Sequence, residues 1–246
     1  MYNNYIFDLY GTLVDIKTNE SKLSLYKNLA AFMTLQGAPY MTNELKSAYK
    51  KHCARVRDFY FKFNCHNHPE ITANEIEIDI KHVIVALYKD KGITPTDDMI
   101  KTWGMLFRSL STDYFKLYDG VEKMLDTLHS KGKRVFLLSN AQRLFTEPEI
   151  LALGLEKKLD SIFISSDIGF MKPSKYFYDS LFEQVKISKG DSVMIGNDAM
   201  ADCMGAHNYG IDSMYVHTDQ SPKKDIVLPE NCIKLKAIKD VSKYVK

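Results

Sequence analysis

The spacing of apolar residues changes twice along the chain. A short apolar and aromatic run over residues 4–9 stops at Gly11, which is typical of a buried strand. Between about residues 18 and 116, apolar residues recur at helical spacing and strand signals are few. We expect helices near 20–36, 42–63, 72–91 and 96–116. Four helices of this length can bury their apolar faces against one another as a bundle.

From about residue 117 onward, short apolar runs alternate with helical stretches. The runs that predict strands lie at 134–138, 161–165, 192–196, 213–217 and 232–235. Helical spacing near 120–131, 143–153, 174–185 and 199–208 separates the earlier runs. Strands that alternate with helices indicate a parallel sheet covered on both faces.

The first predicted strand has no partner before residue 134, so the helical segment has the position of an insertion. We therefore expect an α/β fold with a doubly wound, parallel, Rossmann-like sheet core, made of residues 1–16 and 117–246. Residues 17–116 are expected to form an inserted all-α cap domain, a helical bundle.

Composition and charge exclude several classes of protein. Of the 246 residues, 45% are hydrophobic and 26% are charged, which is typical of a globular chain. The net charge of +2 gives no signature of binding to nucleic acid or to an anionic membrane. No run of about 18 apolar residues predicts a membrane span. The first residues do not resemble a secretory signal, and the four cysteines form no C-x-x-C pair, so we expect a cytoplasmic protein with reduced thiols.

Chemically active side chains follow the predicted strands. In an open parallel sheet, ligands bind beyond the carboxyl ends of the strands, so these residues are expected to converge at one edge. Carboxylates can hold a cation or attack a substrate, while lysine and serine can hold an anion. In strand order, these residues are Asp8, Tyr10, Gly11 and Thr12, then Ser139 and Asn140, then Lys172, and finally Asn197, Asp198 and Asp202.

Four of these segments resemble the motifs of the haloacid dehalogenase (HAD) superfamily. Each motif is weak by itself, but four in order, each after a predicted strand, are specific. The helical segment matches the helical cap of that family by position only. The matching segments are Asp8-Leu9-Tyr10-Gly11-Thr12-Leu13-Val14-Asp15, Leu138-Ser139-Asn140, Met171-Lys172-Pro173, and Gly196-Asn197-Asp198 with Asp202.

The resemblance implies a hydrolase in which Asp8 is the nucleophile and forms a covalent aspartyl intermediate. It implies that Ser139 and Lys172 hold the anionic oxygens of the transferred group. It also implies Mg²⁺ as cofactor, because Mg²⁺ takes few carboxylates and keeps several waters. The expected metal ligands are Asp8, the backbone carbonyl of Tyr10, Asp198, and Asp202 directly or through water. The expected substrate contacts are Tyr10, Gly11, Thr12 and Asn140.

One position departs from the phosphatases of the family. They usually have a second aspartate two residues after the nucleophile, which protonates the leaving group, and this chain has Tyr10 there. A free tyrosine has a pKa of about 10 and exchanges protons poorly at neutral pH. The dehalogenase branch has tyrosine here, because halide leaves without a proton. Whether Tyr10 has a chemical role stays open at this point.

Two other features argue against dehalogenation. The spacing of Asp198 and Asp202 is that of the phosphatases, whereas dehalogenases need no metal. Dehalogenases also use a cap arginine about thirty residues after the nucleophile, and the segment 34–40 has none. Arg55 and Arg57 are the nearest downstream, and could replace it only if their helix brings them over the site.

The sequence therefore predicts a Mg²⁺-dependent phosphatase that acts on a small phosphorylated metabolite, as a monomer or homodimer without nucleic acid or membrane partners. One alternative is a metal-independent 2-haloacid dehalogenase. Another is a catalytically weak protein that binds a phosphorylated ligand or a protein partner. The substrate itself is not predictable, because helical spacing does not fix which cap side chains face the site.

Overall fold

Six parallel strands form the central sheet of the computed structural model, which describes residues 2–223 and 227–245. Their order is β5-β4-β1-β6-β7-β8, so β1 lies in the middle, between two strands that come much later in the chain. This order confirms the predicted doubly wound α/β fold. The strands are β1 (Asn4–Phe7), β4 (Arg134–Ser139), β5 (Ser161–Ile164), β6 (Ser192–Gly196), β7 (Asp212–Val216) and β8 (Ile233–Leu235).

Alternate side chains of the strands enter two separate hydrophobic clusters, one on each face of the sheet. Tyr5 and Phe7 of β1 pack with α5 (Val121–Ser130), α6 (Arg143–Ala152) and the 3₁₀-helix η5 (Ile238–Tyr244). Ile6, between them, enters the opposite cluster, which contains residues of α8 (Lys175–Val185) and α9 (Gly205–Tyr209). Successive side chains of a strand point to opposite faces of the sheet, and helices cover both faces, so both sets of side chains are buried.

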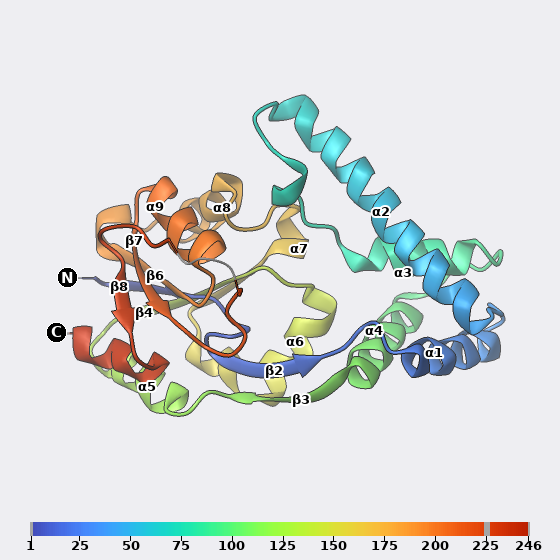
Figure 1. Ribbon diagram of the computed structural model, residues 1–246, viewed down its shortest axis with the longest axis horizontal. Coiled ribbons are helices and arrows are strands. Elements are labelled where there is room, and N and C mark those ends of the chain that lie inside the picture. The colour runs from blue at the N-terminus through green and yellow to red at the C-terminus, as the bar shows by residue number, and fades with distance from the viewer. Residues whose placement is uncertain (1, 224–226, 246) are drawn as a thin grey trace.

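The inserted helices form a second lobe beside the sheet (Figure 1). Their apolar faces enclose a cluster that includes the fully buried Trp103. Within the described residues, no helix is both long and apolar enough to cross a lipid bilayer. The helices are α1 (Leu23–Leu35), α2 (Thr42–Asn67), α3 (Ile80–Lys89) and α4 (Asp97–Ser111).

The helix predicted over residues 72–91 is too long at its start, because α3 begins only at Ile80. Ile76 and Ile78 are buried and Glu77 lies between them, a period-two pattern that suits extended backbone. Ile76 pairs with Phe170 of the sheet lobe, and before it lies only a short 3₁₀ turn, η1 (Ala73–Glu75).

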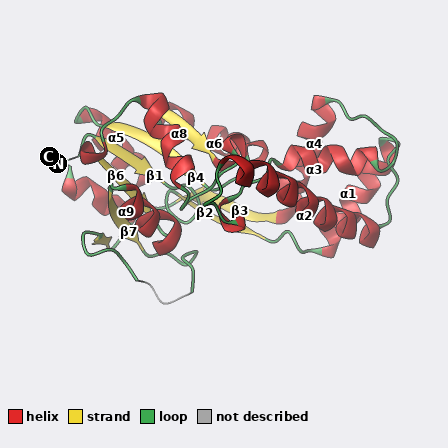
Figure 2. Ribbon diagram, turned by 90° about the horizontal axis from the view of Figure 1, so that it is seen from above, coloured by secondary structure: helices red, strands yellow, loops and turns green. Residues whose placement is uncertain are grey.

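A two-stranded antiparallel ribbon connects the lobes, and the sequence patterns did not predict it. It pairs β2 (Val14–Thr18) with β3 (Thr112–Leu117), so the helix predicted over residues 96–116 ends at Ser111 instead. Figure 2 shows the ribbon running from the sheet to the helices. The predicted boundaries after residue 16 and before residue 117 both fall inside it, and the assignment of residues 17–116 as a cap domain stays a prediction.

Helix α6 belongs to both lobes, because its two halves pack in different directions. Ile150 lies in the cluster under the sheet, whereas Leu144 and Phe145 lie in the helical cluster. The ring of Phe145 stacks on Phe107 of α4, with 5.6 Å between centroids. At the same interface, a Cβ atom on Gly104 of α4 would lie 2.5 Å from Cγ of Leu144, so the glycine allows the two helices to approach.

We therefore predict that Gly104→Ala destabilises the protein. The added methyl group overlaps the branched centre of Leu144 and costs about 1–3 kcal/mol as overpacking, against a gain in helix propensity of about 1 kcal/mol. The thermal unfolding midpoint should fall, as measured by circular dichroism. Gly190→Ala is the matched control, because its Cβ would meet its nearest neighbour at an ordinary 3.9 Å. Equal midpoints for the two variants would contradict the prediction.

Candidate active site

The carboxyl ends of the three central strands converge on a pocket of about 280 Å³. Asp8 directly follows β1, Ser139 ends β4, and Asn197 directly follows β6. The backbone N–H of Asp8 donates to the carbonyl of Ile195 at 2.9 Å, which fixes the nucleophile candidate against β6. The pocket is lined by Asp8, Tyr10, Ser139, Asn140, Lys172, Asn197, Asp198, Ala201, Asp202, Gln220 and Pro222.

Lys172 lies at the centre of the charged groups. Its ammonium donates to Oδ1 of Asp8 at 2.8 Å and to Oδ1 of Asp202 at 2.7 Å, and its side chain is only 1% exposed. Burial alone would lower the pKa of Lys172, but the charges of Asp202 and Asp8 outweigh that effect and raise it. The lysine therefore stays a cation, which is what a site for anionic oxygens requires.

Asn140 holds the backbone of Lys172. Its amide nitrogen donates to the Lys172 carbonyl at 3.0 Å, and its amide oxygen accepts from the Lys172 N–H at 2.8 Å. Both polar ends of the side chain are thus used to position the lysine, a role that the sequence patterns did not indicate. Asn140 also lines the pocket, and its predicted contact with substrate stays a prediction.

Asp198 and Asp202 are held differently in the turn after β6. Oδ1 of Asp198 accepts from the N–H groups of Met200 and Ala201, both at 2.9 Å, and so caps the π-helix η4 (Ala199–Met204). Its Oδ2 accepts no hydrogen bond from the described residues. Both oxygens of Asp202 are used, one by Lys172 and the other by the N–H of Asp198 at 2.9 Å. Asp202 therefore holds both Lys172 and the Asp198 backbone, and its predicted contact with a metal ion, directly or through water, stays a prediction.

The turn after Asp8 packs tightly against Asn197. Gly11 has a φ of +79°, and a Cβ atom there would lie 2.2 Å from Nδ2 of Asn197, so no other residue fits without displacing that side chain. The hydroxyl of Thr12 is buried, 3.4 Å from Oδ2 of Asp8 and 3.3 Å from Oδ1 of Asn197. These two residues shape the turn, and their predicted contacts with substrate remain untested.

Ser139 has an unused hydroxyl in the pocket wall. Its Oγ atom is buried and has no hydrogen-bond partner among the residues that the structure describes. A buried hydroxyl without a partner costs about 1–3 kcal/mol. Since Ser139 also lines the pocket, a bound anionic oxygen would satisfy it.

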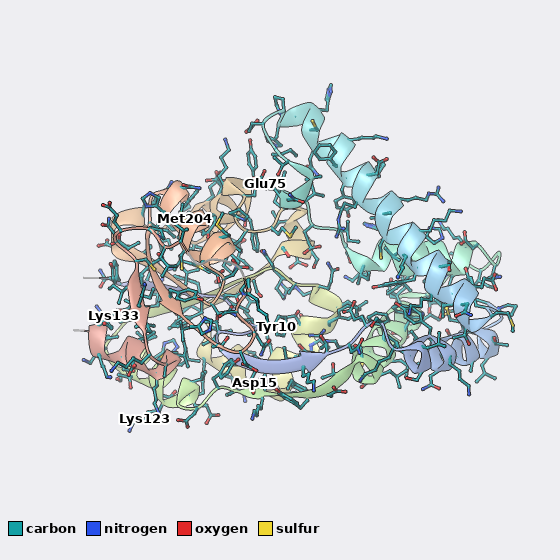
Figure 3. All side chains as sticks on the ribbon, viewed as in Figure 1. Tyr10, Asp15, Glu75, Lys123, Lys133 and Met204 are labelled. Atoms are coloured by element: carbon teal, nitrogen blue, oxygen red, sulfur yellow. The ribbon has the colours of Figure 1, made fainter. Side chains whose placement is uncertain are left out.

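The side chain of Tyr10 extends from the pocket wall toward helix α6 rather than toward Asp8. Its hydroxyl donates to Oε2 of Glu149 at 2.5 Å and lies 2.9 Å from Oγ1 of Thr146. Burial, together with the negative charge of Glu149, raises the pKa of Tyr10 above its ordinary value. Figure 3 shows Tyr10 at the centre of the molecule, near β2 and α6. Its phenol is a poor source of protons for a leaving group.

A larger chamber of about 820 Å³ adjoins the pocket and shares Tyr10, Asn140 and Gln220 with it. Both lobes contribute to its walls. The lining residues include Tyr49 and Arg57 of α2 and Phe145 of α6. Of the two arginines considered from sequence, Arg57 faces this chamber, whereas Arg55 lines a separate groove.

The donor set fits Mg²⁺ only as a sparsely coordinated ion. Within the described parts of the chain, no group of three or more His, Cys, Asp or Glu side chains is arranged to hold a metal. Asp8, Tyr10 and Asp198 all line the pocket, and Oδ2 of Asp198 accepts no hydrogen bond from the described residues. Mg²⁺ is usually bound by one or two carboxylates and retains several waters, so these groups suit it.

Several residues of the site escaped the sequence patterns. Gln220 and Pro222 line the pocket from the loop after β7, and the signal for them is their position beyond the carboxyl end of that strand. Tyr178, buried on α8 six residues after Lys172, supports the turn after β6, because its hydroxyl donates to the carbonyls of Ala201 and Asp202.

Comparison with known proteins gives one family. A family model described as haloacid dehalogenase-like hydrolase matches residues 2–210. The HAD-hydrolase YfnB of Bacillus subtilis is 22% identical over 229 residues, which is 93% of this chain and 89% of YfnB. Glyceraldehyde 3-phosphate phosphatase of Methanothermobacter thermautotrophicus is 26% identical over 115 residues, 47% of this chain and 51% of that protein.

Solved structures share the fold over the full chain. The structure of YfnB bound to magnesium covers 100% of this chain and 99% of its own, with a TM-score of 0.55 and 18% identity. The L-2-haloacid dehalogenase of Xanthobacter autotrophicus covers 100% and 98%, with a TM-score of 0.56 and 13% identity.

We predict that Lys172→Met destabilises the protein by about 3–5 kcal/mol at pH 8, because it leaves buried carboxylates unpaired. The loss should be smaller at pH 5. Burial raises the pKa of Asp202 even with the opposing charge of Lys172 present, and the second carboxylate, Asp8, adds to the increase. Without the ammonium, the folded protein binds more protons than the unfolded chain above about pH 4, so its stability falls as pH rises.

Thermal unfolding midpoints at the two pH values test this prediction. Lys175→Met is the control, because Lys175 is 58% exposed and pairs with Glu70 at the surface. An equal loss of stability for Lys172→Met at both pH values would contradict the assigned ion pairs.

Proposed function

The chain belongs to the haloacid dehalogenase-like hydrolases, and from this premise we propose that it is a Mg²⁺-dependent phosphatase of small phosphorylated substrates. The observation that supports this most is the pocket itself. It combines a nucleophile candidate, Asp8, with a buried cation, Lys172, an unpaired hydroxyl on Ser139 and a partly free carboxylate on Asp198. This set can neutralise a phosphoryl group and attack it from the same edge of the sheet.

In the proposed reaction, a carboxylate oxygen of Asp8 attacks phosphorus. A bond forms between that oxygen and phosphorus as the bond from phosphorus to the substrate oxygen breaks, and the substrate leaves as an alkoxide or phenoxide that takes a proton from water. Water then hydrolyses the aspartyl phosphate, which restores Asp8 and releases inorganic phosphate. Oδ1 of Asp8 is held by Lys172, so the carboxylate is oriented before substrate binds.

Lys172 and Ser139 are proposed to hold the phosphoryl oxygens. Lys172 and Ser139 both line the small pocket, and the Ser139 hydroxyl has no other partner among the described residues. Fixed donors of this kind stabilise charge that develops in the transition state, because they need no reorganisation at the moment of reaction.

Asp8, Asp198 and the carbonyl of Tyr10 are proposed to hold Mg²⁺, which when bound would neutralise charge on the phosphoryl oxygens. Asp202, with both oxygens engaged, is proposed to act by holding Lys172 and the Asp198 turn. Residues 17–116 are proposed to act as the cap domain, because the chamber between the lobes is where the rest of the substrate would lie.

The direction of the Tyr10 side chain weakens the case for dehalogenation, since its hydroxyl is engaged by Glu149 and Thr146 on α6. The second candidate, a 2-haloacid dehalogenase, retains one supporting observation. Arg57 lines the chamber and could replace the missing cap arginine. The partial relative named as a glyceraldehyde 3-phosphate phosphatase favours phosphorylated substrates.

We predict that the protein hydrolyses p-nitrophenyl phosphate in the presence of Mg²⁺. Its leaving group needs little protonation, so the missing acid should not hide the activity. Asp8→Asn should lower the rate by about 10³-fold or more, because an amide is a poor nucleophile. A chelator should abolish the activity of the unmodified protein. Asp191→Asn, an exposed site at the opposite end of β6, is the control and should leave the rate unchanged.

Two outcomes would redirect the proposal. Chelator-resistant release of chloride from 2-chloropropionate, without phosphatase activity, would indicate the dehalogenase. Saturable binding of a phosphorylated ligand without turnover of either substrate would indicate a protein that binds rather than hydrolyses.

A further inference from the structure

An ion pair joins the two lobes next to the active site. Arg108 lies in the last turn of α4, and Glu149 lies on α6. The Nε atom of Arg108 donates to Oε1 of Glu149 at 2.6 Å, and Nη2 donates to Oε2 at 3.3 Å. The two side chains are only 15% and 7% exposed. A pair this buried is stabilising only when its remaining hydrogen-bonding groups are also satisfied.

Tyr10 satisfies this pair from the sheet lobe. Its hydroxyl donates to Oε2 of Glu149, the same oxygen that Nη2 of Arg108 reaches. The guanidinium of Arg108 also lies over the ring of Tyr10, 5.4 Å from its centroid, and 5.7 Å from that of Phe145. Each aromatic face adds a cation–π contact. Tyr10 thus contacts both charged partners, one through its hydroxyl and the other through its ring.

The helices on which the pair lies cannot easily separate. Phe107 and Phe145 stack next to the pair, and Gly104 allows α4 to approach Leu144 of α6. The apolar part of the interface therefore fixes the pair in place. Tyr10 attaches to a rigid partner rather than to a mobile surface side chain.

The turn that contains Tyr10 is short and internally bonded. The N–H groups of Leu13 and Val14 donate to the carbonyl of Leu9 at 2.8 Å, and the N–H of Gly11 donates to the carbonyl of Val14 at 2.8 Å. Asp8 lies two residues before Tyr10, and the connecting ribbon begins at Val14. A change in the position of the Tyr10 ring would therefore move the turn that carries the nucleophile.

We propose that Tyr10 is a positioning residue, which ties the turn after Asp8 to the Arg108–Glu149 pair and so holds the nucleophile in register with the helical lobe. Tyr10, at the position of the usual acid, would thus have a different task at the same site. The proposal rests on the proposed function wherever turnover is measured.

The test uses Tyr10→Phe, which keeps the ring and removes the hydroxyl, in the full chain with Mg²⁺. Its kcat should fall about 10- to 100-fold, with KM little changed. The factor should be the same for a series of aryl phosphates whose leaving groups differ in basicity. Glu149→Gln should also lower kcat, because its amide leaves one acceptor oxygen for Arg108 and Tyr10 together. The double variant Tyr10→Phe/Glu149→Gln should lose less than the product of the two single losses, because both changes weaken the same contact between Tyr10 and Glu149.

Arg143→Met is the matched control. Arg143 donates to Asp167 at 2.6 and 2.9 Å, but this pair joins α6 to α7 (Ser165–Ile168) within the sheet lobe. Its rate should equal that of the unmodified protein. Arg108→Lys keeps the charge without the two-pronged contact, and should lose part of the activity that Arg108→Met loses.

Hydrogen exchange of the backbone amides of residues 9–14 gives a readout that needs no turnover. Exchange should be faster in Tyr10→Phe and Arg108→Lys than in the unmodified protein and in Arg143→Met. If no aryl phosphate is hydrolysed by the unmodified protein, the proposed function fails, and exchange still decides whether Tyr10 positions the turn.

Two results would overturn the proposal. A loss of activity that is confined to Tyr10→Phe and increases with leaving-group basicity would make Tyr10 a proton donor. Unchanged exchange of residues 9–14 in Tyr10→Phe would show that its hydroxyl does not hold the turn.

Discussion

The burial of one ammonium group organises the active site. Lys172 is almost without solvent contact, and a buried cation is tolerated only where anions surround it. Asp8 and Asp202 supply them from the segments after β1 and β6, and Asn140 holds the lysine backbone from the segment after β4. One electrostatic requirement thus fixes the relative positions of the segments after β1, β4 and β6. The lysine also stabilises Asp8 and Asp202, because without it the two carboxylates would repel each other in a buried pocket.

The small charged pocket and the larger chamber beside it differ in the parts of the chain that form their walls. The small pocket holds the charged groups and lies wholly within the sheet lobe, where strand ends determine distances. The chamber beside it has aromatic, amide and charged walls from both lobes, including Tyr49, Gln142 and Arg57. A transferred group needs fixed geometry, whereas the rest of a substrate needs complementary shape. Under the proposed function, the sheet edge would serve the first task, and the chamber walls from the inserted segment would serve the second.

The sequence was sufficient for the sheet and for the charged residues at its edge, because both follow from local patterns. A continuous apolar run such as Tyr5, Ile6 and Phe7 predicts a strand buried on both faces, and the residue after that strand is placed at the edge. The ribbon between the lobes was missed because β3 is largely exposed and continues directly from α4, so no turn residue in the sequence separates the strand from the helix. The start of α3 was misplaced because Ile76 and Ile78 are buried by contacts that are distant in sequence.

The direction of Tyr10 was beyond sequence reasoning for a similar reason, since its partners lie about 100 and 140 residues away along the chain, at Arg108 and Glu149. Motif comparison identifies what the position lacks, namely a carboxylate beside the nucleophile. It cannot show what the larger side chain reaches. A carboxylate at position 10 could shuttle protons, but its shorter side chain would leave Glu149 without the hydroxyl donor that Tyr10 provides. Under the proposed function, tyrosine in place of aspartate would replace proton transfer by attachment between the lobes and would favour leaving groups that need little protonation.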